Sequence, residues 1–114
     1  MNRFSKITTV IFLFLILTGI FPLRAQWVED GVPICTAPGV QTTEFIVSDG
    51  VGGGIIAWFD RRNNNIGIYA QRINASGAVQ WTADGVVICA DEAGWYGPRM
   101  ISDGAGGAII IWQD

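Results

Sequence analysis

Four aspartates stand where carboxyl groups could act as a general acid and a general base, namely Asp49, Asp60, Asp103 and Asp114. Two such carboxyl groups are the catalytic equipment of most glycoside hydrolases. A catalytic pair, however, needs its two carboxyl groups in unlike surroundings, whereas these aspartates recur at a spacing of 54 residues. The repetition favours a structural role, in which Asp49 and Asp103 cap turns by accepting hydrogen bonds from backbone N–H groups. A second hypothesis is that these two residues hold one Ca²⁺ per repeat.

Other kinds of catalysis are excluded for this chain by its composition. It has no histidine, so it cannot form a Ser-His-Asp triad, a Cys-His pair or an imidazole metal site. The glycine cluster at residues 50–54 has no Lys-Ser/Thr after it, and a strand rather than a helix is expected to follow. We therefore predict a tight turn here instead of a phosphate loop, and we predict no catalytic residue and no cofactor.

The tryptophans fall into two groups. Trp27, Trp58, Trp81 and Trp112 recur with the repeat, which favours packing between repeats over sugar-stacking platforms. Trp95 and Tyr96 replace Gln41 and Thr42 of the other copy and so break the repeat. Loops that differ in this way often face ligands. The candidate ligand-facing loop consists of Glu92, Trp95, Tyr96 and Arg99, with local packing of the two aromatic rings as the alternative.

Cys35 and Cys89 occupy equivalent positions of the repeat. Equivalent points on stacked sheets lie about 10 Å apart, whereas a disulfide requires Cα atoms within roughly 7 Å. We therefore expect two buried thiols that act as small apolar side chains rather than one disulfide.

The elements that position these residues belong to an internal repeat. Residues 26–60 align with residues 80–114 without a gap, and sixteen of the thirty-five pairs are identical. The identities form two blocks, Gln-Trp-x-x-Asp-Gly-Val-x-Ile-Cys and Ser-Asp-Gly-x-Gly-Gly-x-Ile-Ile-x-Trp-x-Asp. Long self-similarity of fixed period is typical of propellers and repeat arrays, so the copies are predicted to span residues 26–79 and 80–114.

Within one period the apolar pattern predicts short strands joined by turns, and nowhere the 3.6-residue spacing of a helix. The strands are expected at Phe45–Ser48, Ile55–Phe59, Ile66–Ile73 and Ala78–Thr82. A further apolar run, Val86–Ala90, either continues the fourth strand past a kink or lines the crossover to the next unit. Four sequential antiparallel strands form a propeller blade. The predicted fold class is therefore all-β, with about one and a half propeller-like blades.

Residues 1–25 have the layout of a helical, cleavable secretory signal peptide. Arg3 and Lys6 give the positive end, Val10–Leu17 is an apolar run too short to span a bilayer, and Ala25 precedes the expected cut. We expect no membrane insertion after cleavage. Residues 26–114 then carry four arginines against ten acidic residues, a net charge of 4 − 10 = −6. This balance lacks the basic footprint of a nucleic-acid binder.

Three stretches carry a resemblance to a known class of proteins, namely residues 68–81, 84–89 and 101–112, with the motifs Ile-Tyr-Ala-Gln-Arg-Ile-Asn, Asp-Gly-Val-x-Ile-Cys and Ile-Ser-Asp-Gly-x-Gly-Gly-Ala-Ile-Ile-x-Trp. They resemble the repeats of large exported proteins of Bacteroidetes and related bacteria, which are similar to β-propeller repeats. The resemblance implies that a type IX secretion sorting domain often ends such proteins. Pro98 keeps the pattern before its strand, while Glu44 departs from it.

The combined expectation is a secreted or cell-surface repeat protein that serves as a scaffold or a binding and adhesion module for an unknown protein or carbohydrate ligand. Because the repeat stops halfway through its second copy, further copies are expected beyond residue 114. The alternative is the N-terminal part of an exported, carbohydrate-active hydrolase whose catalytic residues lie outside this segment.

Overall fold

The computed structural model describes residues 27–90 and 97–113, so the predicted signal peptide lies outside the described part. The described residues form strands β1 (Gln41–Ser48), β2 (Gly54–Asp60), β3 (Gly67–Ile73), β4 (Val86–Cys89), β5 (Arg99–Ser102) and β6 (Ala108–Ile111), with one 3₁₀ turn, η1 (Arg62–Asn64). No α-helix occurs in these two ranges, as the periodicity predicted. Among the described residues, none belongs to a helix long and apolar enough to cross a membrane.

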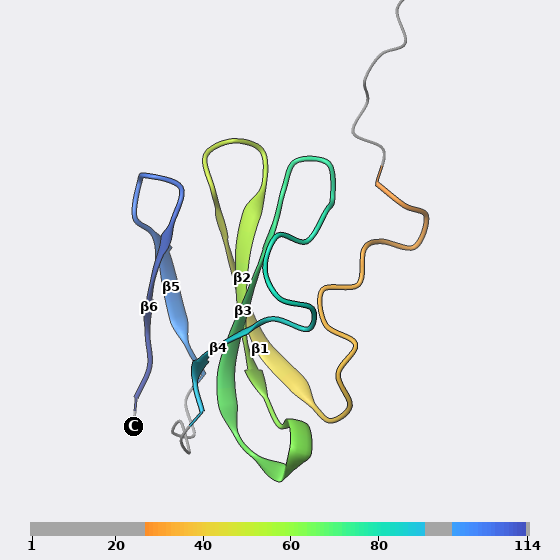
Figure 1. Cartoon of the computed structure of the whole chain (residues 1–114). Coiled ribbons are helices and arrows are strands. Elements are labelled where there is room, and N and C mark those ends of the chain that lie inside the picture. The colour runs from red at the N-terminus through yellow and green to blue at the C-terminus, as the bar shows by residue number, and fades with distance from the viewer. Residues whose placement is uncertain (1–26, 91–96, 114) are drawn as a thin grey trace, which may run out of the picture.

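Strands β1 to β4 form one antiparallel sheet in sequential order (Figure 1). Strand β2 lies at its centre and pairs with β3 over its whole length, from Gly54 opposite Ile73 to Asp60 opposite Gly67. All but one residue of β2 are buried, which agrees with its apolar side chains on both faces. The prediction of a unit of four antiparallel strands joined in sequence is confirmed.

Strand β1 starts four residues before the predicted Phe45. The register between β1 and β2 shifts between Thr42 and Phe45, and Thr43 within the shift has a φ of 57°. This bulge allows the polar run Gln-Thr-Thr-Glu to join the ladder although it shows no apolar alternation. Bulges disrupt a ladder locally and bend the strand, so the alternation alone placed the strand start too late.

The fourth strand was predicted in the wrong place. Of residues 78–82 only Val79 forms a bridge, an isolated one with Ile73, and the strand that completes the sheet is β4. Residues 80–85 leave the ladder between these two contacts and turn at Asp84-Gly85, where both residues have positive φ. The run after the kink therefore continues the pairing along β3, which was the first of the two alternatives.

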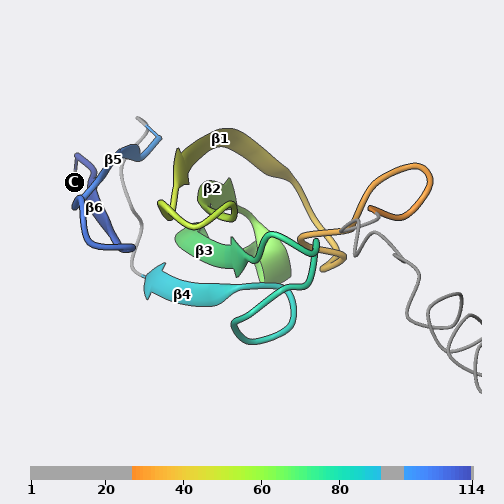
Figure 2. The same ribbon diagram turned by 90° about the horizontal axis from the view of Figure 1, so that it is seen from above.

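Strands β5 and β6 form a separate antiparallel hairpin that packs on one face of the four-stranded sheet (Figure 2). Met100 is buried there together with Ile55, Ala57 and Ala70. Side chains packed around this cluster are Phe45, Val47, Val86, Ala108 and Ile110. Residues 27–40 lie on the other side of the sheet, so the hairpin covers only one of its faces.

The two blocks of sequence identity are also repeated in three dimensions. Gly31 N–H donates to the carbonyl of Val28 at 3.1 Å, and Gly85 N–H donates to that of Thr82, 54 residues further on, at 2.9 Å. Asp30 and Asp84 both have positive φ, of 66° and 64°. Identical sequence thus produces the same Asp-Gly turn in both copies, because the left-handed conformation suits Asp and Gly better than most residues.

The packing between repeats that was predicted for the recurring tryptophans is seen at Trp58. Only Trp58 is fully buried, at 2 % exposure, whereas Trp27, Trp81 and Trp112 are 51 %, 37 % and 40 % exposed. Side chains alternate between the faces of a strand, so Trp58 lies on the side of β2 opposite to the Ala57 side that packs on the hairpin. It packs against Gly85, which belongs to the second copy, and stacks with Tyr69.

Candidate functional site

The glycine cluster forms two equivalent turns, one between β1 and β2 and one between β5 and β6. In the first, Asp49 Oδ1 accepts hydrogen bonds from the N–H groups of Val51 and Gly53 at 2.9 and 2.8 Å. In the second, Asp103 Oδ1 accepts from Ala105 and Gly107 at 2.7 and 2.8 Å. The predicted capping role of both aspartates is confirmed, and it explains why the Ser-Asp-Gly-x-Gly-Gly block recurs.

Serine and glycine complete each turn. Ser48 Oγ accepts from the N–H of Gly50, and Ser102 Oγ from that of Gly104, both at 3.0 Å. The chain must also pass through positive φ at the first and second glycine of each turn, a conformation that glycine adopts at low cost. The serine, the aspartate and the glycines that the two turns share therefore all stabilise the turn itself.

A cleft of about 490 Å³ lies between the two turns, and it is open to solvent. We take it as a candidate binding site. Its walls come from the same turn of the two copies together with one arginine of β3: Ser48, Asp49, Gly50, Val51, Arg72, Ser102, Gly104, Ala105 and Gly106. The turns meet closely, since a Cβ on Gly106 would lie 3.5 Å from the carbonyl oxygen of Asp49.

Asp49 and Arg72 form the charged wall of this cleft. Arg72 Nη2 donates to Asp49 Oδ2 at 3.1 Å, and the Asp49 side chain is 1 % exposed while that of Arg72 is 32 % exposed. The hydrogen bond from Val51, with those from Gly53 and Arg72, holds the pKa of Asp49 below its ordinary value despite burial. Asp49 is therefore an ionised, hydrogen-bonded anchor near neutral pH and is poorly suited to deliver a proton.

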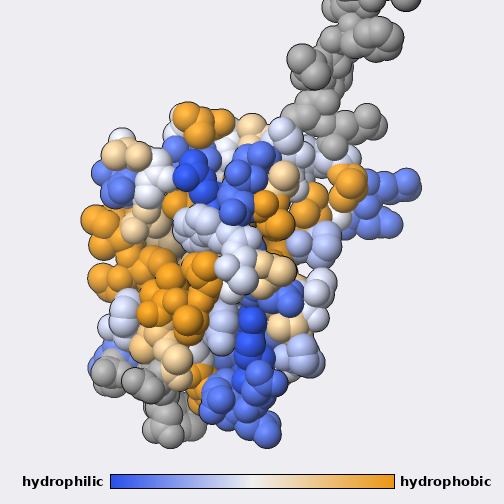
Figure 3. Space-filling model, in the orientation of Figure 1, coloured by the Kyte–Doolittle hydropathy of each residue, from blue (hydrophilic) through white to orange (hydrophobic). Residues whose placement is uncertain are grey.

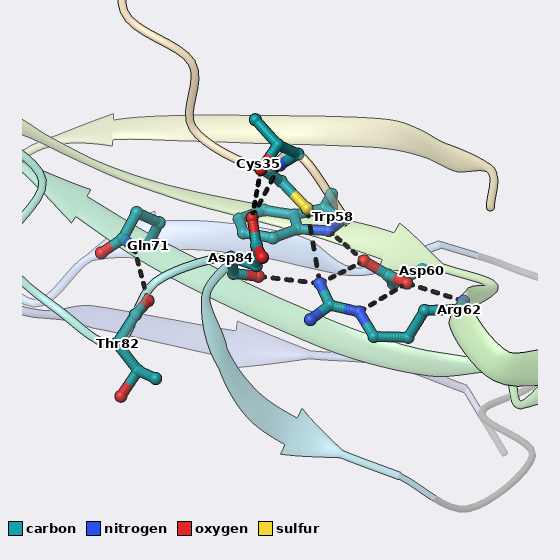
Figure 4. Close-up of polar contacts among 8 residues, drawn as sticks. Cys35, Trp58, Asp60, Arg62, Gln71, Thr82 and Asp84 are labelled. Atoms are coloured by element: carbon teal, nitrogen blue, oxygen red, sulfur yellow. Dashed lines mark hydrogen bonds and ion pairs between the residues drawn. The ribbon is translucent and has the colours of Figure 1, made fainter. Parts of the chain in front are cut away.

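A second polar cluster lies at the opposite end of β2 (Figure 4). Asp60 is fully buried and accepts from Trp58 Nε1 at 2.9 Å, from Arg62 Nε at 2.9 Å and from Arg62 Nη2 at 2.6 Å. The Arg62 guanidinium also lies over the ring of Tyr69, 3.8 Å from its centre. Burial alone would raise the pKa of Asp60, but the hydrogen bonds from Arg62 and Trp58 outweigh it and leave the pKa lowered.

The same arginine joins the N-terminal segment and the 80–85 loop to the sheet. Arg62 Nη2 donates to the carbonyl of Asp84 at 2.7 Å and to Cys35 Sγ at 3.4 Å. Asp84 Oδ1 in turn accepts from the N–H and the hydroxyl of Thr36, and these bonds lower the pKa of Asp84. Cys35 and Cys89 are not joined in a disulfide, but both are half-buried rather than buried.

Residues 80–85 do not pair with β3 as a strand, and the side-chain amide of Gln71 forms hydrogen bonds with their backbone instead. Its side chain is fully buried. Nε2 donates to the carbonyl of Thr82 at 2.9 Å, while Oε1 accepts from the N–H of Trp81 at 2.9 Å. Because buried backbone groups need partners, this amide satisfies the loop that covers Trp58. Nothing in the local sequence marks Gln71 or Arg72 for these roles, since both depend on the register of β3.

Of the predicted ligand-facing loop, Glu92, Trp95 and Tyr96 lie outside the described residues. Arg99 is exposed at the start of β5, and its guanidinium lies 5.1 Å from the centre of the Phe45 ring. It is not among the residues that line the cleft. In residues 27–90 and 97–113 no three His, Cys, Asp or Glu side chains gather in a way that could hold a metal ion.

Comparison with known proteins adds no relative, since no protein family, no curated protein and no solved structure matches this chain.

The lowered pKa values predict a loss of stability in acid. Folded-state pKa values below those of the unfolded chain mean that Asp49, Asp60 and Asp84 stabilise the fold when ionised, above roughly pH 4. This stability is lost as the pH falls through the lower folded values. We expect the urea midpoint, followed by tryptophan fluorescence, to stay level between roughly pH 7 and 5 and to fall below roughly pH 4. A midpoint that rises on acidification would contradict the assignment.

Proposed function

We propose that the chain is an exported, propeller-type β-repeat protein that acts as a binding module, and that it holds its ligand in the cleft between the two glycine turns. The observation that carries this proposal is the position of the cleft, which is bounded by the same turn from two successive repeats. Its volume lies in the usual range of small-ligand pockets, roughly 300–1,000 Å³.

The chemistry of the walls favours a carbohydrate as the ligand. Ser48 and Ser102 contribute hydroxyl groups, and Arg72 contributes a partly exposed guanidinium. Hydroxyls and N–H donors of this kind can exchange hydrogen bonds with the hydroxyls of a sugar ring. The Asp49 carboxylate has its hydrogen bonds from Val51, Gly53 and Arg72, so it supports the walls and leaves binding rather than hydrolysis as the proposed role.

Filling the cleft should weaken binding without disturbing the turns. Ala105 lines the cleft and is exposed, and only its backbone takes part in the capping bonds of Asp103. We therefore expect Ala105→Trp to weaken binding about tenfold or more, equivalent to roughly 1.4 kcal/mol. The measurement is a calorimetric titration of the chain with cellohexaose, xylohexaose and chitohexaose, which are three soluble oligosaccharides of different composition.

The matched control is Asn65→Trp, which places the same large ring on an exposed, extended residue at the opposite end of β2 and β3. This control should bind like the unmodified chain. If none of the three oligosaccharides binds, the carbohydrate assignment is wrong. If Ala105→Trp and Asn65→Trp bind equally well, the ligand lies outside the cleft.

A further inference from the structure

Strands β1 and β2 of the first copy and strands β5 and β6 of the second copy are equivalent two-strand units. These two units contact each other through different sides. The β1–β2 side that faces the hairpin carries Val47, Ile55 and Ala57, and the hairpin packs Met100, Ala108 and Ile110 against it. Counting 54 residues back, Met100, Ala108 and Ile110 correspond to Ile46, Gly54 and Ile56, which lie on the opposite side of β1 and β2. The contact is therefore head-to-tail, with one side of the first copy against the other side of the second.

Each two-strand unit also has its other side, which is not covered by the other unit. Residues Val47, Ile55 and Ala57 correspond to Ile101, Ile109 and Ile111 of the hairpin, which are 63 %, 52 % and 62 % exposed. On the β1–β2 unit Ile46 is 69 % exposed and Ile56 is partly exposed. We name the first set the hairpin patch and the pair Ile46 and Ile56 the sheet patch. Figure 3 shows apolar side chains gathered over the β5–β6 side of the molecule.

We propose that a second copy of this chain docks its sheet patch on the hairpin patch and so continues the stack between molecules. The contact within one molecule is the evidence for this partner. It already joins the surfaces that are equivalent to the sheet patch and the hairpin patch. Each patch consists of isoleucines, and the exposed Arg99, which pairs with Ile111, borders the hairpin patch. Exposed apolar patches of this kind mark interaction sites. A head-to-tail contact leaves one patch free on each outer molecule, so growth into an open stack or closure into a ring follows.

The test uses one lysine substitution in each patch of the full chain. Ile109→Lys places a charge in the hairpin patch, and Ile46→Lys places one in the sheet patch. Both residues are more than half exposed, so each variant should fold, which circular dichroism checks. Sedimentation equilibrium should show that the average mass of the unmodified chain rises with concentration, and that each variant alone associates about tenfold more weakly or not at all. Val40→Lys, at a 57 % exposed valine before β1, is the control.

Mixing the two variants gives the decisive result. The Ile109→Lys molecule keeps its sheet patch and the Ile46→Lys molecule keeps its hairpin patch, so the mixture should form a dimer of one of each that grows no further. An unmodified chain that stays monomeric at every concentration overturns the proposal, and so does a mixture of folded variants that stays monomeric. If either variant alone associates as well as the unmodified chain, the contact is not head-to-tail and the proposal is wrong. The cleft residues are unchanged in every variant.

Discussion

Replacing Asp60 with alanine should destabilise the fold by about 3–5 kcal/mol, the usual cost of removing one partner of a buried ion pair. Asp60 is fully buried, and its carboxylate accepts four hydrogen bonds, from Trp58 Nε1 and from the N–H, Nε and Nη2 of Arg62. Without it the Arg62 side chain, only 16 % exposed, keeps its charge but loses its counterion. A loss of this size is comparable to the whole stability of a small domain.

The measurement is the free energy of unfolding from urea titrations, with tryptophan fluorescence as the signal. Arg61→Ala is the matched control, because it removes a neighbouring guanidinium that is exposed, and it should change the stability by no more than about 0.5 kcal/mol. Asp60→Asn keeps the size of the side chain and should fall between the two. An Asp60→Ala variant within about 1 kcal/mol of the unmodified chain would contradict the anchoring role of this cluster.

Replacing Gly85 with alanine should have an effect of similar size for a different reason. Gly85 has a φ of 91°, and a Cβ there would lie 2.5 Å from the indole ring of Trp58 and 3.0 Å from the carbonyl oxygen of Ala70. Trp58 is buried and hydrogen-bonded to Asp60, so the ring cannot move aside without disturbing the second cluster. We expect a loss of about 3 kcal/mol or more, combining backbone strain of about 1–2 kcal/mol with overpacking of about 1–3 kcal/mol.

The repeat supplies the control for this prediction. Gly31 is the equivalent residue, with a φ of 89° and no atom within 4 Å of its Cβ position. Gly31→Ala therefore suffers the backbone strain alone, about 1–2 kcal/mol. The difference between the two variants in urea titrations measures the contact with Trp58. Equal losses would mean that the loop can move away from the indole ring and that the contact is not rigid.

The features that were predictable from the sequence are those that depend on near neighbours. The turn at Asp49 and its copy at Asp103 follow from a carboxylate and glycines at fixed spacing, and the strands β2 and β3 follow from their apolar runs. The antiparallel order followed because short turns separate these runs. Each of these features depends on residues within about ten positions of one another, so the pattern itself contains the information.

What could not be predicted depends on register and on contacts between distant segments. The fourth strand was misplaced because the amide of Gln71 replaces ladder bonds and allows residues 80–85 to leave the sheet. The cluster around Arg62 was missed because Cys35 and Asp84 approach it from opposite directions along the chain. The residues that contact Trp58 could not be named in advance, because periodicity identifies a buried residue without saying which face of the strand it occupies.

The unlike surroundings of Gly31 and Gly85 bear on how a duplicated sequence diverges. A tandem duplication begins with two identical loops, yet only one of them comes to lie against an indole ring. Asparagine tolerates positive φ better than most residues, so drift to asparagine would be accepted at residue 31 and rejected at residue 85. We therefore expect different purifying selection on the two copies at this position, although both copies adopt the same local turn.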